Sequence, residues 1–74
     1  MTTNEIIGSN IRMHRQKKKM TISQLADRLT EFDCIVSDSV IGAWERGERS
    51  ITAANLWSIA RALDCTMDTM MQEP

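Results

Sequence analysis

Residues 37–47 read SDSVIGAWERG, and this run predicts one complete helix together with both of its ends. Ser37 can cap the helix, because its hydroxyl can accept a hydrogen bond from an amide of the first turn. Ile41 and Trp44 stand three positions apart and therefore share one side. The glycine that closes the run suits the left-handed backbone with which helices often end. We therefore expect a helix over about residues 38–46 with one apolar side.

A second helix is predicted upstream of this one. Thr21 and Gln24 have the spacing of a capping box, in which the threonine hydroxyl and the glutamine side chain satisfy each other's backbone amides. Apolar residues follow at helical spacing, at Ile22, Leu25, Ala26 and Leu29. We expect this helix over about residues 22–32.

The segment 30–36, between these two helices, is ambiguous. The upstream helix can run on through Phe32, or the segment can form a bulged loop. If the helix runs on, Ile35 or Val36 is expected to enter the core.

Three further helices are expected. The first begins near Thr3 or Asn4, either of which can cap it, and has Ile7, Ile11 and His14 on one face. Its end carries lysines at 17–19, where positive charge suits the helix dipole.

The fourth helix is capped by Thr52, and its stripe consists of Leu56, Ile59, Ala60 and Leu63. The fifth is short and is capped by Thr66, with Met67, Met70 and Met71 on its inner face. Helices this short are unstable alone, so we expect one all-α domain over residues 1–74.

Composition excludes several classes of protein. The 74 residues are 42% hydrophobic and 26% charged, an ordinary globular balance, and no run is long enough to cross a membrane. The start lacks the pattern of a signal peptide, and two cysteines, Cys34 and Cys65, do not make a disulfide framework. We expect a cytoplasmic protein with reduced thiols.

Enzymatic chemistry is not expected. No nucleophile has a base at usable spacing, and the one histidine, His14, lies on an apolar stripe. No metal-ligand spacing is present, and a chain this small has no room for a deep cavity. We expect no metal, no cofactor and no small-molecule ligand.

The order of these segments resembles a known family. Ile7-Gly8, Ile11-Arg12, Arg15, Met20-Thr21 and Leu25-Ala26 fall at the spacings of the phage repressor/Cro-type (Xre-like) helix-turn-helix family, as do Ile41, Trp44-Glu45-Arg46-Gly47 and Ala60-Arg61-Ala62-Leu63. The resemblance covers about residues 6–71 and implies a compact five-helix, lambda-repressor-like DNA-binding domain. Its helix-turn-helix would be formed by helices 2 and 3.

The resemblance implies a transcriptional regulator, repressor-like, whose third helix enters the major groove of an operator. Base-facing positions would be Asp38, Ser39, Gly42 and Ala43. Backbone contacts would come from Thr21, Ser23, Ser37, Arg46, Arg49 and Ser50. Arg15 and Glu45 match a structural ion pair that joins helix 1 to the end of the recognition helix.

The sequence departs from the family pattern in four respects. Segment 30–36 lengthens the turn, and Ile22 replaces a common glutamine. The recognition helix is chemically poor, with Asp38 where glutamine is common and with Gly42 and Ala43 where polar residues are common. Lys19 and Asp64 stand where glycines are expected after helices 1 and 4, which predicts some backbone strain.

Two functions remain open at this stage. The first is a homodimeric DNA-binding regulator whose dimer surface comprises Trp57, Met67, Met70 and Met71. Its basic residues gather at 12–19 and again at Arg46 and Arg49, although the net charge is −1. The second is a protein-interaction module of the same fold, antirepressor-like or antitoxin-like, that does not bind DNA. A positive strip along the third helix and the following loop would favour the first.

Overall fold

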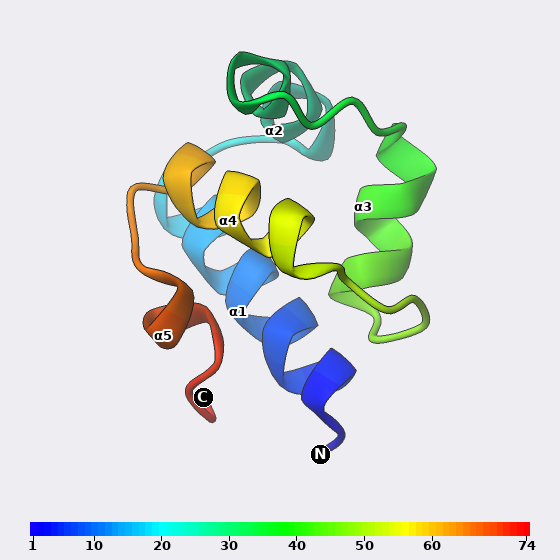
Figure 1. Ribbon diagram of the computed structural model, residues 1–74, viewed down its shortest axis with the longest axis vertical. Coiled ribbons are helices and arrows are strands. Elements are labelled where there is room, and N and C mark those ends of the chain that lie inside the picture. Colours follow the sequence, from blue (N-terminus) through cyan, green and yellow to red (C-terminus); the bar gives the residue numbers. More distant parts are fainter.

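The computed structural model describes residues 1–74 and contains no strand. The helices are α1 (Thr3–Lys17), α2 (Ile22–Leu29), α3 (Asp38–Glu45), α4 (Ala53–Ala62) and α5 (Met67–Met70), and a single 3-10 turn, η1 (Thr30–Phe32), follows α2. Helix α1 lies between α3 and α5 and contacts both, while α2 packs against α3 and α4 (Figure 1). The expected all-α fold is confirmed.

Every α-helix begins at a hydroxyl cap. The capping side chains are Thr2, Thr21, Ser37, Thr52 and Thr66. The cap of α1 is one residue earlier than expected, because Thr2 and Glu5 form a capping box of their own, like that of Thr21 and Gln24. The hydrogen bonds that hold Glu5 to Thr2 also lower the pKa of the Glu5 carboxyl. The helix starts are therefore set by residues close in the sequence.

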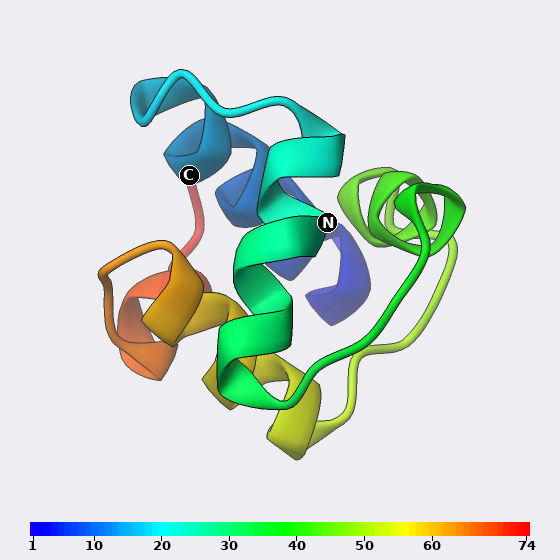
Figure 2. The same ribbon diagram turned by 90° about the horizontal axis from the view of Figure 1, so that it is seen from above.

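The connector between α2 and α3 takes a form that sequence alone did not settle. The α-helix ends at Leu29, and η1 carries the chain to Asp33, which is left-handed with φ 60°. An extended segment then leads to α3 (Figure 2). Helix α2 is thus shorter than the expected 22–32, although the whole of 22–32 is helical if η1 is included.

The residue that the connector buries is Cys34. Its amide donates to the carbonyl of Leu29, and its side chain lies in the core. Of the two residues expected as alternatives, Val36 packs partly against the core, whereas Ile35 is 87% exposed. The left-handed turn at Asp33 redirects the chain and points Cys34 inward instead. Burial raises the pKa of the Cys34 thiol, so it stays protonated.

The core collects apolar side chains from all five α-helices. Its largest fully buried side chains are Trp44, Ile11, Leu25, Leu29, Ile41, Ile59 and Met70. His14 is half-buried, as expected, and its Nε2 has no hydrogen-bond partner. None of the helices is long and apolar enough to cross a membrane.

Helix α5 buries fewer methionines than expected. Met70 is in the core and Met67 packs against it, but Met71 is exposed. The helix ends at Met70, so Met71 is its C-cap and lies beyond the single turn whose inner side Met67 and Met70 share. The buried amide of Asn10 holds this end of the chain by donating to the carbonyls of Met70 and Gln72, both at 2.7 Å.

The two non-glycine residues expected to be strained are left-handed. Lys19 and Asp64 both have φ 56°. Asp64 accepts a hydrogen bond from Lys18 Nζ at 2.6 Å and lies 3.7 Å from Arg28 Nη2, so it joins the ends of α1 and α4 to α2. These contacts compensate a backbone conformation that a glycine would adopt without strain.

Candidate nucleic-acid interface

An open depression lies between the start of α2 and the exposed side of α3. The residues that line it are Arg15, Thr21, Ile22, Ser23, Asp38, Ser39, Gly42 and Arg46. Six of these eight were expected to contact DNA, so the fold gathers most of that set on one surface. Ile22 and Arg15 complete the lining.

Two helix N-termini border this depression. The hydroxyl oxygens of Thr21 and Ser37 accept hydrogen bonds from the amides of Gln24 and Val40. Each cap uses only the oxygen, so each hydroxyl proton is free to donate outward. Free amides in a first turn, together with the positive end of the helix dipole, attract anions such as phosphate.

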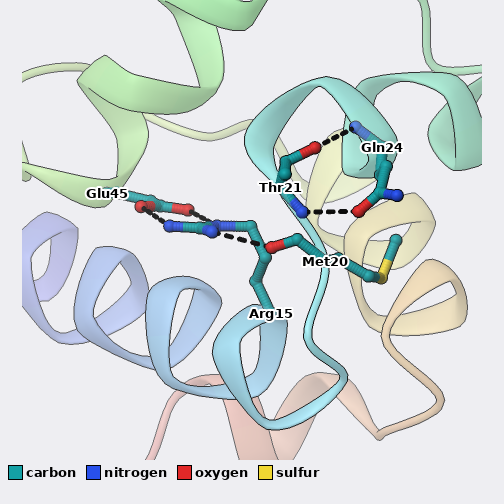
Figure 3. A network of polar contacts seen from close by, with 5 residues as sticks. All are labelled: Arg15, Met20, Thr21, Gln24 and Glu45. Atoms are coloured by element: carbon teal, nitrogen blue, oxygen red, sulfur yellow. Dashed lines mark hydrogen bonds and ion pairs between the residues drawn. The ribbon is translucent and has the colours of Figure 1, made fainter.

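The recognition helix is attached to α1 by the ion pair that the resemblance implies. Arg15 donates to both carboxylate oxygens of Glu45, from Nε at 2.6 Å and from Nη2 at 2.9 Å (Figure 3). Its Nη1 donates to the carbonyl of Met20 at 2.9 Å, immediately before the capping box of α2. The hydrogen bond to Glu45 raises the pKa of Arg15. One guanidinium thus links the end of α1, the start of α2 and the end of α3.

Gly42 is buried and lies beneath Arg46, one turn further along α3. A Cβ added at Gly42 would stand 3.1 Å from Arg46 Nη1. The guanidinium therefore rests against the helix backbone where a larger residue would displace it. Gly42 therefore contributes to this surface by leaving room for Arg46. Ala43, the next residue, is partly exposed.

Charges along α3 and the following loop are mixed. Arg46 Nε donates to Glu48 at 2.9 Å, while Arg49 is exposed and has no ion pair. Ser50 accepts a hydrogen bond from Asn4 at 3.4 Å, which ties the loop to the start of α1. The positive strip is thus short and consists of Arg46 and Arg49, with Glu48 partly neutralising the former.

Ser23 and Asp38 contact each other across the depression. The Ser23 hydroxyl, on the first turn of α2, donates to Oδ2 of Asp38, the first residue of α3. Both residues were expected to face DNA separately. No sequence spacing indicates this contact, because it depends on the angle between the two helices.

The four residues expected to form a dimer surface differ in exposure. Met70 is in the core and cannot contact a partner, whereas Trp57 is 49% exposed. Trp57 packs edge-on against Phe32, with ring centroids 6.4 Å apart, and Arg61 lies over both rings at 5.6 and 5.9 Å. The spacing of Trp57 and Arg61, one turn apart on α4, is the sequence signal that could have indicated this cluster.

Comparisons with known proteins agree with this geometry. The Helix-turn-helix family matches residues 11–70. The HTH-type transcriptional regulator DicA of Escherichia coli (strain K12) is 34% identical over 65 residues, which make up 88% of this chain and 44% of DicA. The chain therefore spans less than half the length of that relative. The restriction-modification controller protein C.AhdI from Aeromonas hydrophila has a similar structure, with a TM-score of 0.79 and 25% identity, over 90% of this chain and 94% of that chain.

Proposed function

The chain belongs to the helix-turn-helix family of the Xre/Cro type, and from this premise we propose that it binds double-stranded DNA as a transcriptional regulator. The observation that carries the proposal is the depression between α2 and α3, because it joins two open helix N-termini to Arg46 on the exposed side of α3. In a helix-turn-helix the second helix enters the major groove, while the first crosses the phosphate backbone.

The contacts of the proposed complex divide by chemistry. Thr21, Ser37 and Arg49 would donate to phosphates, and these contacts set the position of α3 without reading sequence. Asp38, Ser39 and Ala43 would face base edges in a groove about 12 Å wide. Arg15 and Glu45 would hold α3 at the angle that this arrangement needs.

We propose a homodimer as the DNA-binding form, since a single unit reads only a half-site. The surface that supports it lies at Phe32 and Trp57, whose rings pack edge-on, and Trp57 is a large apolar side chain that the fold leaves exposed. Phe32 and Trp57 also line a small depression with Asn55 and Ala54. The partner would be a second copy of this chain.

The dimer is tested by sedimentation velocity over a concentration series. Trp57→Ala should shift the protein toward the monomer, because it removes the largest exposed aromatic side chain. Met13→Ala is the matched control, since Met13 is also exposed but lies on α1. Equal dimerisation of both variants and the parent protein would exclude this surface.

DNA binding is tested by selection from random duplexes, followed by titration of the selected duplex at two salt concentrations. An enriched near-palindrome whose log affinity falls by several units per log unit of salt supports a regulator that contacts several phosphates. Absence of enrichment together with absence of binding at low salt would contradict the proposal. The mixed charge around Asp38 and Glu48 would then favour the protein-interaction module as the function of this fold.

A further inference from the structure

We infer that Asp38, held in place by Ser23, makes the DNA site prefer cytosine at one base pair of each half-site. This inference rests on the proposed function, because it concerns which base sequence the recognition helix selects. It assigns two roles: Asp38 contacts the base, and Ser23 is a positioning residue.

The carboxylate of Asp38 is available to a ligand on one side only. Its Oδ2 accepts the hydrogen bond from Ser23, while Oδ1 has no hydrogen-bond partner in the protein. Asp38 is exposed and no basic side chain forms an ion pair with it. Because it is the first residue of α3, it lies at the end of the helix that enters a groove first in such complexes.

The ionised carboxylate of Asp38 can accept hydrogen bonds but cannot donate them, and this restricts the base that Asp38 can contact. In the major groove guanine presents two acceptors, N7 and O6, and thymine presents the acceptor O4 beside a methyl group. Adenine presents a donor next to the acceptor N7, which a carboxylate oxygen would repel. Cytosine presents the N4 donor and no acceptor of its own in the major groove, so it is the base that matches an ionised carboxylate.

The hydrogen bond from Ser23 strengthens the preference of Asp38 for cytosine over the other bases. An exposed aspartate changes rotamer freely, and a mobile carboxylate could turn away from an unsuitable base. The hydroxyl of Ser23 holds Oδ2 on the side of α2, and this leaves Oδ1 in one orientation. A base opposite Oδ1 must then present a donor to it, or the complex loses affinity.

The test compares the sequences selected by the parent protein and by Asp38→Asn. Asparagine can still accept from Ser23 through its one carbonyl oxygen, which places its NH2 donor toward the base, and a donor matches the N7 and O6 acceptors of guanine. We expect a cytosine at one position of each half-site for the parent protein. For the variant we expect guanine there, with a change of about tenfold in the ratio of affinities for the two bases.

Asp68→Asn is the matched control, since Asp68 also lies in the first turn of a helix and the charge change is identical. It should leave the selected base unchanged. Ser23→Ala should reduce the preference for cytosine over the other bases by about tenfold or more, the effect of one hydrogen bond to a charged group. A merely structural serine would instead weaken binding to all sequences equally.

Each outcome separates the two proposals. If the parent protein selects no sequence and does not bind DNA at low salt, the proposed function fails. If it selects a site that lacks cytosine at this position, or if Asp38→Asn selects the same base as the parent, the protein binds DNA but this inference is wrong. If Ser23→Ala leaves the base preference unchanged while lowering overall affinity, Ser23 has no positioning role.

Discussion

Gly8 of α1 lies directly against the carbonyl group of Trp44 in α3. A Cβ added at Gly8 would overlap the Trp44 carbonyl oxygen and would stand 2.9 Å from that of Glu45. These obstacles are backbone atoms, which cannot turn aside as a flexible side chain can. The close approach of α1 and α3 therefore depends on this glycine, and it brings Arg15 within reach of Glu45.

Gly8→Ala should destabilise the protein by at least about 1–3 kcal/mol, because the two helices must separate to admit the methyl group. Gly42→Ala is the matched comparison, since its Cβ would meet only the end of the Arg46 side chain. Alanine is also favoured over glycine within a helix by about 1 kcal/mol. Urea denaturation of both variants measures the difference, and equal stabilities would show that α1 and α3 can move apart freely.

Glu45→Gln should lower the free energy of unfolding by about 2 kcal/mol, the range for hydrogen bonds to charged groups. The side chains of Arg15 and Glu45 are only 12% and 6% exposed, so the guanidinium would lose its counter-charge where water replaces it poorly. The double variant Arg15→Ala with Glu45→Gln should cost less than the sum of the single changes. Additive effects in thermal or chemical denaturation would mean that the two side chains act independently.

The contribution of Asp64 to stability should depend on pH. The hydrogen bond from Lys18, with the charges of Lys18 and Arg28, lowers the pKa of Asp64 from its ordinary value of 3.8. A lowered pKa in the folded state stabilises the protein above about pH 3.8, and this contribution is lost as the pH falls through the folded value.

Asp64→Asn removes this titration but keeps a residue that tolerates the left-handed backbone. The difference in unfolding free energy between the parent protein and Asp64→Asn should therefore shrink as the pH is lowered below 3.8. A constant difference from neutral pH to pH 2.5 would contradict the assignment.

Arg49→Ala should weaken DNA binding about equally on all sequences, and it should lower the salt slope by about one unit. Arg49 is exposed and has no carboxylate partner, so it is free to contact a phosphate. Lys17→Ala is the control, because Lys17 lies two residues from Arg15 and therefore on the opposite side of α1. An unchanged slope for Arg49→Ala would remove it from the phosphate contacts.

Local features of the fold could be predicted because their causes are local. The capping box of Thr21 and Gln24, the cap at Ser37 and the left-handed Gly47 each depend on residues within one turn. The apolar stripes were equally clear, since Ile41 and Trp44 enter the core as their spacing predicts. The start of α1 was misplaced by one residue because three neighbouring residues can all act as caps.

The candidate site likewise has residues that could be predicted from the sequence and contacts that could not. The family resemblance implied that Thr21, Ser23, Asp38 and Arg46 contact DNA, and the fold places them around one depression. The partners of these residues could not be read from spacing, because the contact of Asp38 with Ser23 spans 15 positions and requires the packed angle of α2 and α3. The position of Arg46 one turn beyond Gly42 agrees with their contact, but no helical spacing indicates that Glu48 partly neutralises Arg46.

The sequence by itself determined which segments are helical, where most of them begin and which side of each is apolar, since caps and periodicity act over a few residues. Only the tertiary structure decided that Cys34 rather than Ile35 enters the core, that Met70 is buried while Trp57 stays exposed, and which polar groups meet across the depression. These outcomes depend on distances between helices, and those distances are set by close contacts such as that of Gly8 with Trp44. The packing of the whole core therefore determines which residues a side chain contacts, whereas its neighbours in the chain determine whether it lies in a helix.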